Sequence, residues 1–143
     1  MVHESEGELG AMENDLRSIL VQDPNHAATL NALGYTLTNR TQRYEEAADL
    51  IERALSLSPG DPAILDSLGW VYYKLGQYAQ SEVLLRQAHN AFPDPEVAAH
   101  LGEVLWMQGR QVEARDIWRD GLSRVPAHPI ILEALERLGA DPL

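Results

Sequence analysis

Cysteine is absent from all 143 residues of the sequence. This excludes disulfide bonds, zinc sites built from thiolates and cysteine nucleophiles. It does not identify a compartment, because a chain without cysteine suits the cytoplasm and a bacterial periplasm equally well. The sequence also lacks a run of about 18 apolar residues, the length of a membrane span, and a charged-then-apolar leader at Met1–Gly10. We expect the chain as given to be soluble, with any signal or anchor upstream.

Basic and aromatic residues are scarce. Lys and Arg number 11 against 22 Asp and Glu, which gives a formal net charge of -11. Such a charge repels a phosphate backbone and an anionic membrane surface, so nucleic acid is not expected as a partner. Aromatic residues make up only 6% of the chain, and the apolar content is mostly Ala, Leu, Val and Ile. This composition favours helices over strands, in a single structural unit.

What the sequence does contain is a repeat. Prolines recur at 35, 34 and 33 residue intervals, at Pro24, Pro59, Pro93 and Pro126. A second marker keeps the same period, because a Leu-Gly pair recurs at the same place in the first half of each unit. These pairs are Leu33-Gly34, Leu68-Gly69 and Leu101-Gly102. Two independent markers at one period predict a repeated structural unit.

Each unit reads as two amphipathic helices, because its apolar residues follow i, i+3, i+7 and then i, i+4, i+7 spacings. A glycine within a helix costs about 0.5–1 kcal/mol relative to alanine, so the glycines of the Leu-Gly pairs predict close approach of the paired helix. Gly76 and Gly109 are expected to end the first helices with positive φ. Asp61 and Asp94, each followed by proline, are expected to cap the first helices of the second and third units.

These residues resemble the tetratricopeptide-repeat (TPR) pattern W-x2-L-G-x2-Y, A-x3-F and P. The sizes are kept although the identities drift: Leu30 or Ala98 stands for the first Trp, Ser81 for the small alanine and Gly121 for the later alanine. One extra residue around Arg40–Arg43 is expected to lengthen a turn. The resemblance implies an all-α fold, a right-handed TPR solenoid of antiparallel helix pairs with about eight helices.

The repeat boundaries follow from the same pattern. We predict a single TPR domain over residues 1–143. Its parts are the second helix of a truncated preceding repeat at 7–24, TPR units at 27–61, 62–94 and 95–128, and a C-terminal capping helix and tail at 129–143.

In its overall sequence character, without a diagnostic motif, the chain is similar to the C-terminal part of a proteobacterial outer-membrane TPR lipoprotein. Members of that family act as adaptors that bring substrates to a periplasmic carboxy-terminal processing protease. This resemblance implies a location on the periplasmic side of the outer membrane, with an anchor upstream. It also implies a periplasmic protease or its substrates as partners.

The TPR resemblance implies a binding groove along the first helices of the units. Carried onto this sequence, the groove positions are Asn31, Tyr35, Asn39, Asp66, Trp70, Tyr73, Lys74, His100, Glu103, Trp106 and Met107. Trp and Tyr are enriched among residues that dominate binding energy, so Trp70, Tyr73 and Trp106 are the expected anchors. Aromatic residues at helical spacing are more often packing, which is the expectation for Tyr72, Trp118, Tyr44 and Tyr78. Trp70 and Trp106 are placed off the buried seam by the pattern, and packing remains the alternative for them.

Some TPR domains hold a terminal carboxylate with a clamp of lysine, arginine and asparagine. The matching positions here carry Asn31, Tyr35, Asp66 and Trp70, so that basic clamp is missing and a cytosolic chaperone co-factor is disfavoured. His100 and Glu103 have a spacing that could bind a metal ion, but no second pair completes a site. No nucleophile elbow, P-loop or dinucleotide fingerprint occurs. We therefore predict no cofactor, no metal and no enzymatic activity.

The sequence thus favours a non-catalytic protein-interaction module, a scaffold or adaptor that binds a client protein or peptide in the groove. The alternative is self-assembly, through the exposed repeat end at Gly7–Pro24 or the helix Ile130–Leu138 packing on a second copy. An enzyme is the third class, and no sequence feature supports it. The acidic charge favours partners with basic patches.

Overall fold

Eight α-helices and no strand make up residues 2–143, the part that the computed structural model describes, with side chains described from residue 6 onward. The helices are α1 (Val2–Gln22), α2 (Ala27–Arg40), α3 (Tyr44–Leu57), α4 (Pro62–Lys74), α5 (Tyr78–Ala91), α6 (Pro95–Met107), α7 (Gln111–Arg124) and α8 (Pro129–Leu138). The predicted all-α chain of about eight helices is confirmed. None of the described helices is long and apolar enough to cross a membrane.

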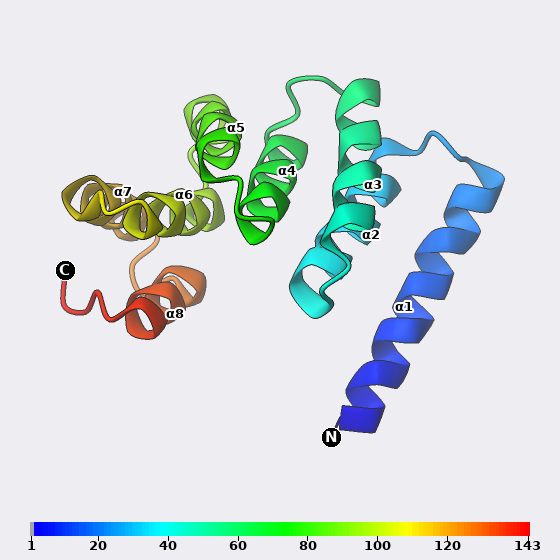
Figure 1. Ribbon diagram of the computed structural model, residues 1–143, viewed down its shortest axis with the longest axis horizontal. Helices are drawn as coiled ribbons and strands as arrows, with labels where there is room; N and C mark the ends of the chain where they lie inside the picture. Colours follow the sequence, from blue (N-terminus) through cyan, green and yellow to red (C-terminus); the bar gives the residue numbers. More distant parts are fainter. Residues whose placement is uncertain (1) are drawn as a thin grey trace.

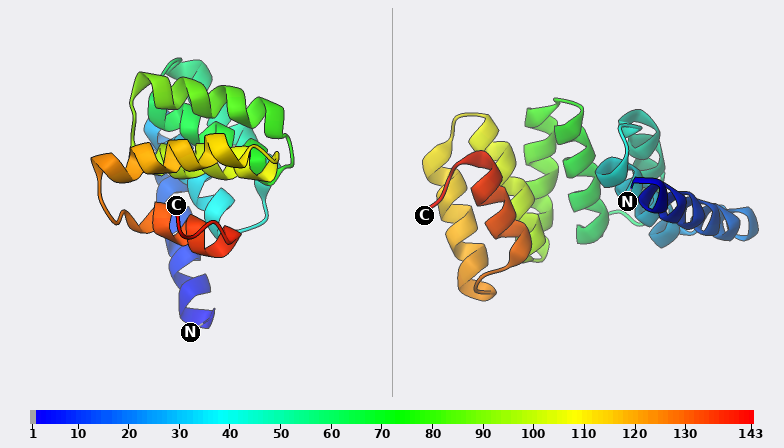
Figure 2. Two further views of the ribbon diagram at one scale, coloured as in Figure 1. Left: turned by 90° about the vertical axis from the view of Figure 1, so that its left-hand side faces the viewer. Right: turned by 90° about the horizontal axis from the view of Figure 1, so that it is seen from below.

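The helices form a stack of pairs, α2 with α3, α4 with α5 and α6 with α7. They follow one another across the molecule in chain order, from α1 at one end to α8 at the other (Figure 1). The first helices α2, α4, α6 and α8 contact one another in succession, and α8 lies against α6 and α7 at the end of the stack (Figure 2). This arrangement places the first helices of all units on one side, which we call the first-helix face.

α1 stands where the second helix of a preceding unit would stand, because it packs on α2 as α3 packs on α4. It begins at Val2, earlier than the start at residue 7 that we predicted, and it ends at Gln22. Gly7 and Gly10 do not interrupt it, since each has an ordinary helical backbone and an added methyl group would meet nothing within 4 Å. Leu16 and Leu20 bury its inner side against the core of α2 and α3.

The helix pairs approach closely at the glycines of the Leu-Gly motifs, as the sequence predicts. A Cβ at Gly69 would lie 2.7 Å from Cγ of Leu85, and one at Gly102 would lie 2.6 Å from Cδ1 of Trp118. Gly34 faces Ile51 in the same way. A side chain at any of these positions would hold the paired helices apart.

The turns within the pairs differ from one expectation. Gly76 and Gly109 both have a φ of 81°, so they end α4 and α6 in the predicted left-handed conformation. The extra residue near Arg40 does not lengthen its turn, which was the expectation. Instead α2 has 14 residues where α4 and α6 have 13. The turn after α2 contains no glycine, and the helix runs one residue further, to Arg40, with Thr41 in an extended conformation as its C-cap.

The helix starts use the predicted caps. The carboxylates of Asp61 and Asp94 accept hydrogen bonds from the N–H groups of Ala63 and Glu96, at 2.9 and 2.8 Å. His128 caps α8, which Gly139 closes in a left-handed conformation. These caps satisfy backbone donors that the helices leave free at their first turns.

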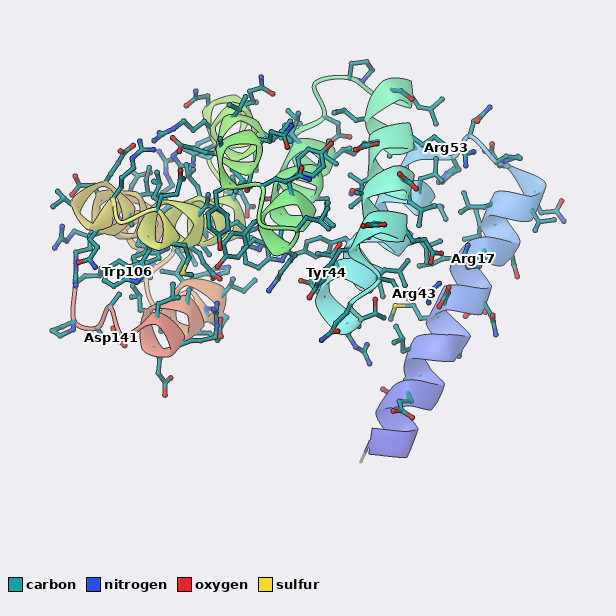
Figure 3. The ribbon with its side chains drawn as sticks, in the orientation of Figure 1. Arg17, Arg43, Tyr44, Arg53, Trp106 and Asp141 are labelled. Atoms are coloured by element: carbon teal, nitrogen blue, oxygen red, sulfur yellow. The ribbon has the colours of Figure 1, made fainter. Side chains whose placement is uncertain are left out.

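Two ionic networks, each made of four side chains, join neighbouring second helices at the surface. In the first, Glu13 and Arg17 of α1 pair with Arg43 and Glu46 at the start of α3 (Figure 3). The second has the same composition two units further along, in Glu82, Arg86, Arg110 and Glu113. Six of the eight side chains are more than a third exposed, with Glu13 and Glu82 the exceptions, so each pair adds about 1 kcal/mol or less to stability. The networks therefore link neighbouring second helices at their surface, while the packing of the helices joins the units.

Candidate functional site

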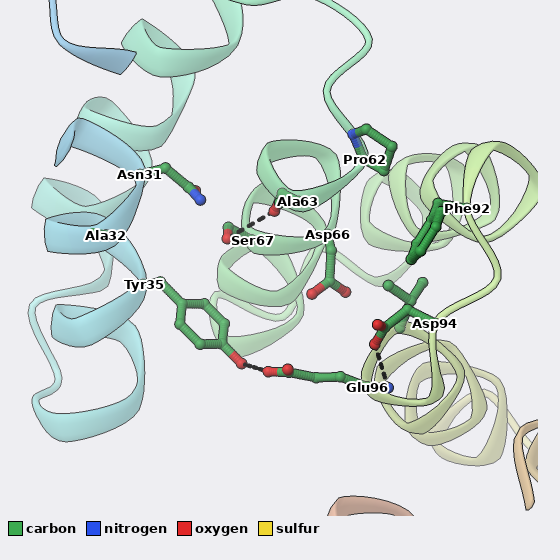
Figure 4. Close-up of a pocket in the computed structure, with 11 residues that line it drawn as sticks. Asn31, Ala32, Tyr35, Pro62, Ala63, Asp66, Ser67, Phe92, Asp94 and Glu96 are labelled. Atoms are coloured by element: carbon green, nitrogen blue, oxygen red, sulfur yellow. Dashed lines mark hydrogen bonds between the residues drawn. The ribbon is translucent and has the colours of Figure 1, made fainter. Parts of the chain in front are cut away.

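The first-helix face contains two adjacent hollows, which together we call the first-helix groove. The first, of about 330 Å³, lies between α2, α4 and the start of α6 (Figure 4). The second, of about 230 Å³, lies between α2, α4, α6 and α8. Tyr35 and Glu96 line both hollows, and the Tyr35 hydroxyl donates a hydrogen bond to Oε1 of Glu96 between them. The groove thus runs across four helices, divided by one tyrosine–glutamate bridge.

The first hollow combines acidic and apolar groups. The carboxylates of Asp66, Asp94 and Glu96 line it, and none of its eleven lining residues is basic. Phe92, which ends α5, stands at its rim with 61% of its surface exposed, next to Pro62 in Figure 4. Asn31 lies on the opposite wall, and its Oδ1 atom is buried without a hydrogen-bond partner. The hollow therefore offers acceptors and an aromatic surface, but no positive charge.

A buried polar stack forms the floor between the hollows. Nδ1 of His100 lies 2.9 Å from Oδ1 of Asp66, which joins α6 to α4. The imidazole stacks on the Trp70 ring, with centroids 4.1 Å apart and planes 16° apart. Burial lowers the pKa of His100, but the Asp66 carboxylate, with Glu96 and Glu103 nearby, outweighs it and raises the pKa above the ordinary value. The protonated imidazole is thus favoured in the folded chain.

The second hollow is closed by an ion pair from α8. Glu103 is only 2% exposed, and Arg137 donates to both of its carboxylate oxygens, at 2.6 and 3.1 Å. The Tyr73 hydroxyl donates to the same carboxylate at 2.7 Å. Burial and this carboxylate raise the pKa of Tyr73. The pair joins residues 34 positions apart, about one repeat, and ties α8 onto α6.

The structure divides the predicted groove residues into two sets. Seven of them line at least one hollow, namely Asn31, Tyr35, Asn39, Asp66, Trp70, His100 and Glu103. Tyr73, Lys74, Trp106 and Met107 line neither. A role in binding stays a prediction for all eleven.

The expectation that Trp70 lies off the buried seam is wrong. Only 6% of its surface is exposed, because Tyr73 and His100 stack on its ring, with Tyr73 at a centroid distance of 5.0 Å. Its Nε1 atom donates to Oδ1 of Asn39 at 3.0 Å. The Lys74 ammonium lies over the ring, 4.8 Å from its centroid. Trp70 therefore builds the groove floor instead of projecting from it.

The Trp106 ring also packs against other side chains of this chain. Its ring lies 5.8 Å from that of Trp118, and the Arg115 guanidinium lies 5.3 Å from its centroid. Trp118 itself is fully buried, as its core position predicts. Trp106 thus belongs to the cluster that α6 and α7 form with the C-terminal residues.

Sequence reasoning missed Phe92, Glu96 and Arg137. Phe92 and Glu96 stand at the junction before and within the first turn of α6, outside the pattern positions used for the groove. Arg137 lies on α8, which was treated as a capping helix alone. The available signal was the period, because α8 continues the series of first helices one repeat after α6.

Metal-binding chemistry finds little support in this groove. In the described part of the chain, no group of three His, Asp or Glu side chains is placed to hold a metal ion. His100 and Glu103 have the helical spacing of metal ligands, but His100 is bonded to Asp66 and Glu103 to Arg137. The polar groups of the floor are engaged with one another.

Comparison with known proteins agrees with this fold. Three tetratricopeptide-repeat family models match residues 13–62, 39–103 and 95–120. TPR repeat-containing protein PA4667 of Pseudomonas aeruginosa is 54% identical over 103 residues, 72% of this chain and 18% of that protein. Protein O-mannosyl-transferase TMTC1 of Homo sapiens is 26% identical over 70% of this chain and 12% of its own length. The chain thus spans less than a fifth of these relatives.

Among solved structures, TTC0263, a thermophilic TPR protein of Thermus thermophilus, superposes with a TM-score of 0.75 at 21% identity. The match covers 93% of this chain and 74% of that one. The repeat models together span residues 13–120, and the helix pairs, the buried Leu-Gly contacts and the glycine turns recur through the same region. This chain therefore belongs to the tetratricopeptide-repeat family.

Proposed function

We propose that this chain is a non-catalytic protein-interaction module that holds a segment of a client protein in the first-helix groove. The observation that carries the proposal is the pair of hollows that runs across α2, α4, α6 and α8. The TPR fold is typical of protein-interaction scaffolds. Concave sites with a few placed polar groups are where proteins bind their ligands.

The groove is also preorganised. Its walls are joined by hydrogen bonds between different helices, Tyr35 to Glu96, Trp70 to Asn39 and Tyr73 to Glu103. These bonds are made without a client, so little ordering of the groove would accompany binding. A rigid surface loses less entropy on association than a mobile one.

The absence of an enzymatic role is part of the proposal. The buried ionisable groups of the groove are engaged in pairs that stabilise the helix stack, His100 with Asp66 and Glu103 with Arg137. TMTC1 is named as a transferase, but the match occupies only 12% of its length. We propose that any catalysis in such relatives belongs to their other regions.

The location and the client of this chain are proposed from its resemblance to outer-membrane TPR lipoproteins. We propose an adaptor on the periplasmic side of a bacterial outer membrane, anchored from outside this segment, whose client is a periplasmic protease or its substrates. The bacterial relative PA4667 is compatible with this proposal, although its name states only the repeat.

Self-assembly is the second candidate, and exposed apolar side chains at the two ends of the stack favour it. Met12, Ile19 and Val21 are exposed on α1, and Ile130 and Leu132 on α8. Packing of either end on a second copy would cover them. Sedimentation equilibrium that finds only monomer at high concentration would exclude this candidate.

The test of the groove uses two matched variants. Ala63 and Ala79 are both exposed and both occupy the second position of a helix, α4 and α5 respectively. Ala63 lines the first hollow, whereas Ala79 lies on a second helix outside both hollows. Ala63→Trp fills the hollow, and Ala79→Trp adds the same bulk elsewhere.

Crosslinking pull-downs from a bacterial envelope extract would then compare the parent chain with both variants. We expect a client that the parent and Ala79→Trp retain and that Ala63→Trp loses. Crosslinks from that client should map to α2, α4 or α6. Equal retention by both variants would reject the groove, and recovery of the chain alone would favour self-assembly.

A further inference from the structure

We propose that the first hollow of the groove receives an arginine side chain from the client. This inference rests on the proposed function, and it names the chemistry that the client must present. It is carried by a comparison of the two hollows within this structure.

The second hollow shows how this groove binds arginine, because the chain supplies one itself. Arg137 enters from α8 and donates to both oxygens of Glu103, which also accepts a hydrogen bond from Tyr73. The site therefore consists of a buried carboxylate, a tyrosine hydroxyl that orients it, and a guanidinium. Such bidentate pairs between arginine and carboxylate are among the stronger polar contacts in proteins.

The first hollow contains a similar tyrosine–glutamate pair without a guanidinium, although Glu96 is only partly buried where Glu103 is fully buried. Tyr35 donates to Glu96 as Tyr73 donates to Glu103. Asp66, which is 7% exposed, and Asp94 also line this hollow, with Oδ1 of Asp66 paired with His100 and Oδ1 of Asp94 capping α6. No basic side chain lines it. Glu96 thus accepts from a tyrosine as Glu103 does, but no arginine lines its hollow, and a guanidinium from outside would supply the cation that Arg137 supplies to Glu103.

The remaining lining favours arginine over other cations. Phe92 stands at the rim with most of its ring exposed, opposite Tyr35, with the carboxylates of Asp66 and Glu96 between them (Figure 4). A planar guanidinium can stack on an aromatic ring while its N–H groups point toward carboxylates, which a compact ammonium does less well. The volume of about 330 Å³ accommodates such a side chain with water.

A further unmet acceptor lies on the α2 wall. Oδ1 of Asn31 is buried and lacks a partner, although the residue itself is only partly buried. Asn31 lines the first hollow, so a guanidinium or a backbone N–H of a client that enters there can donate to its amide oxygen. A donor from the client would satisfy this acceptor, which is unfavourable to leave unpaired when it is buried.

The experiment titrates single-residue probes into the full chain labelled with ¹⁵N. The probes are the N-acetyl N-methylamides of arginine, of lysine and of citrulline, the neutral isostere of arginine. We expect arginine to shift the backbone amides of Ser67, Phe92 and Val97, with a dissociation constant on the order of 1 mM. Citrulline should bind at least about tenfold more weakly, because it lacks the charge.

Two variants locate the effect. Glu96→Gln removes one charge of the hollow and keeps an acceptor for Tyr35, so we expect it to weaken arginine binding several-fold without unfolding the chain. Glu136→Gln makes the same charge change at an exposed position of α8 that lines neither hollow, and it should leave binding unchanged.

Each other outcome overturns the inference. Equal binding of citrulline would remove the role of charge, and equal binding of lysine would remove the preference for arginine. An equal loss in Glu136→Gln would show general attraction to an acidic surface. The probes need no client, so failure of the two proposals can be told apart. A client lost by Ala63→Trp that inserts no arginine would sustain the module and refute the arginine site.

Discussion

Replacing Gly102 with alanine should destabilise this protein, although alanine is normally the better helix former. A methyl group at this position would lie 2.6 Å from Cδ1 of Trp118, and closer still to Nε1 and Cε2. The indole is fully buried and cannot rotate away, and its Nε1 atom donates to the carbonyl of Ala99 at 3.3 Å. Either α6 and α7 must separate or the indole must shift.

The expected magnitude follows from three opposing effects. Overpacking of a core costs about 1–3 kcal/mol. Loss of the indole hydrogen bond adds about 1 kcal/mol, and the helix preference of alanine over glycine returns about 1 kcal/mol. The net loss is therefore about 2 kcal/mol, which corresponds to a fall in Tm of about 4–8 °C for a chain of this length. Thermal and urea unfolding followed by far-UV circular dichroism would measure it.

Gly10→Ala is the matched control, because it lies within α1 and nothing lies within 4 Å of the added methyl. It should be neutral or slightly stabilising. Gly69→Ala should cost less than Gly102→Ala, since the Leu85 side chain that it meets can change rotamer more easily than an indole. A Gly102→Ala variant as stable as the parent, or no less stable than Gly10→Ala, would refute the close-approach argument.

Three further predictions concern the groove and a cap. Arg137→Met leaves the carboxylate of Glu103 buried without its cation and should lower the free energy of unfolding by about 1–3 kcal/mol. Adding Glu103→Gln should restore part of that free energy, because the buried group is then neutral. Urea titration of both variants tests this. His100 has a raised pKa when folded, so its stabilising contribution is fully present below its ordinary pKa of 6.5 and is lost as pH rises through the folded value. The advantage of the parent over His100→Gln should therefore shrink as the pH rises above about 6.5, and an advantage that grows would contradict the pairing with Asp66. Asp61→Ala removes the cap of α4 and should cost about 1 kcal/mol, seen as a lower Tm, and no change would show that another group caps this helix.

The parts of the fold that follow from local chemistry were predictable. Gly76 and Gly109 end their helices with positive φ, and Asp61 and Asp94 cap the next ones, because each depends on a few consecutive residues. The extra residue near Arg40 shows the limit of such reasoning. Its presence was evident from the sequence, but helix extension and a longer turn are both local solutions, and contacts with the rest of the chain select between them.

The candidate site was predictable in position and not in detail. Seven of the eleven groove residues line the hollows, because helical periodicity assigns a side chain to one face of its own helix. Periodicity does not say what else reaches that face. His100 and Tyr73 cover Trp70, and Arg137 arrives from a helix that the groove pattern did not include.

The sequence by itself determined the repeat, the helix boundaries to within a few residues and the close contacts at the Leu-Gly glycines. All of these follow from spacings within one unit. Only the tertiary structure decided that Trp70 is buried, that Phe92 is exposed at the rim of the first hollow, and that one hollow holds an arginine while its neighbour holds none. These features join residues about 30 to 60 positions apart, such as Tyr35 and Glu96, whose meeting depends on how each helix pair is rotated against the next.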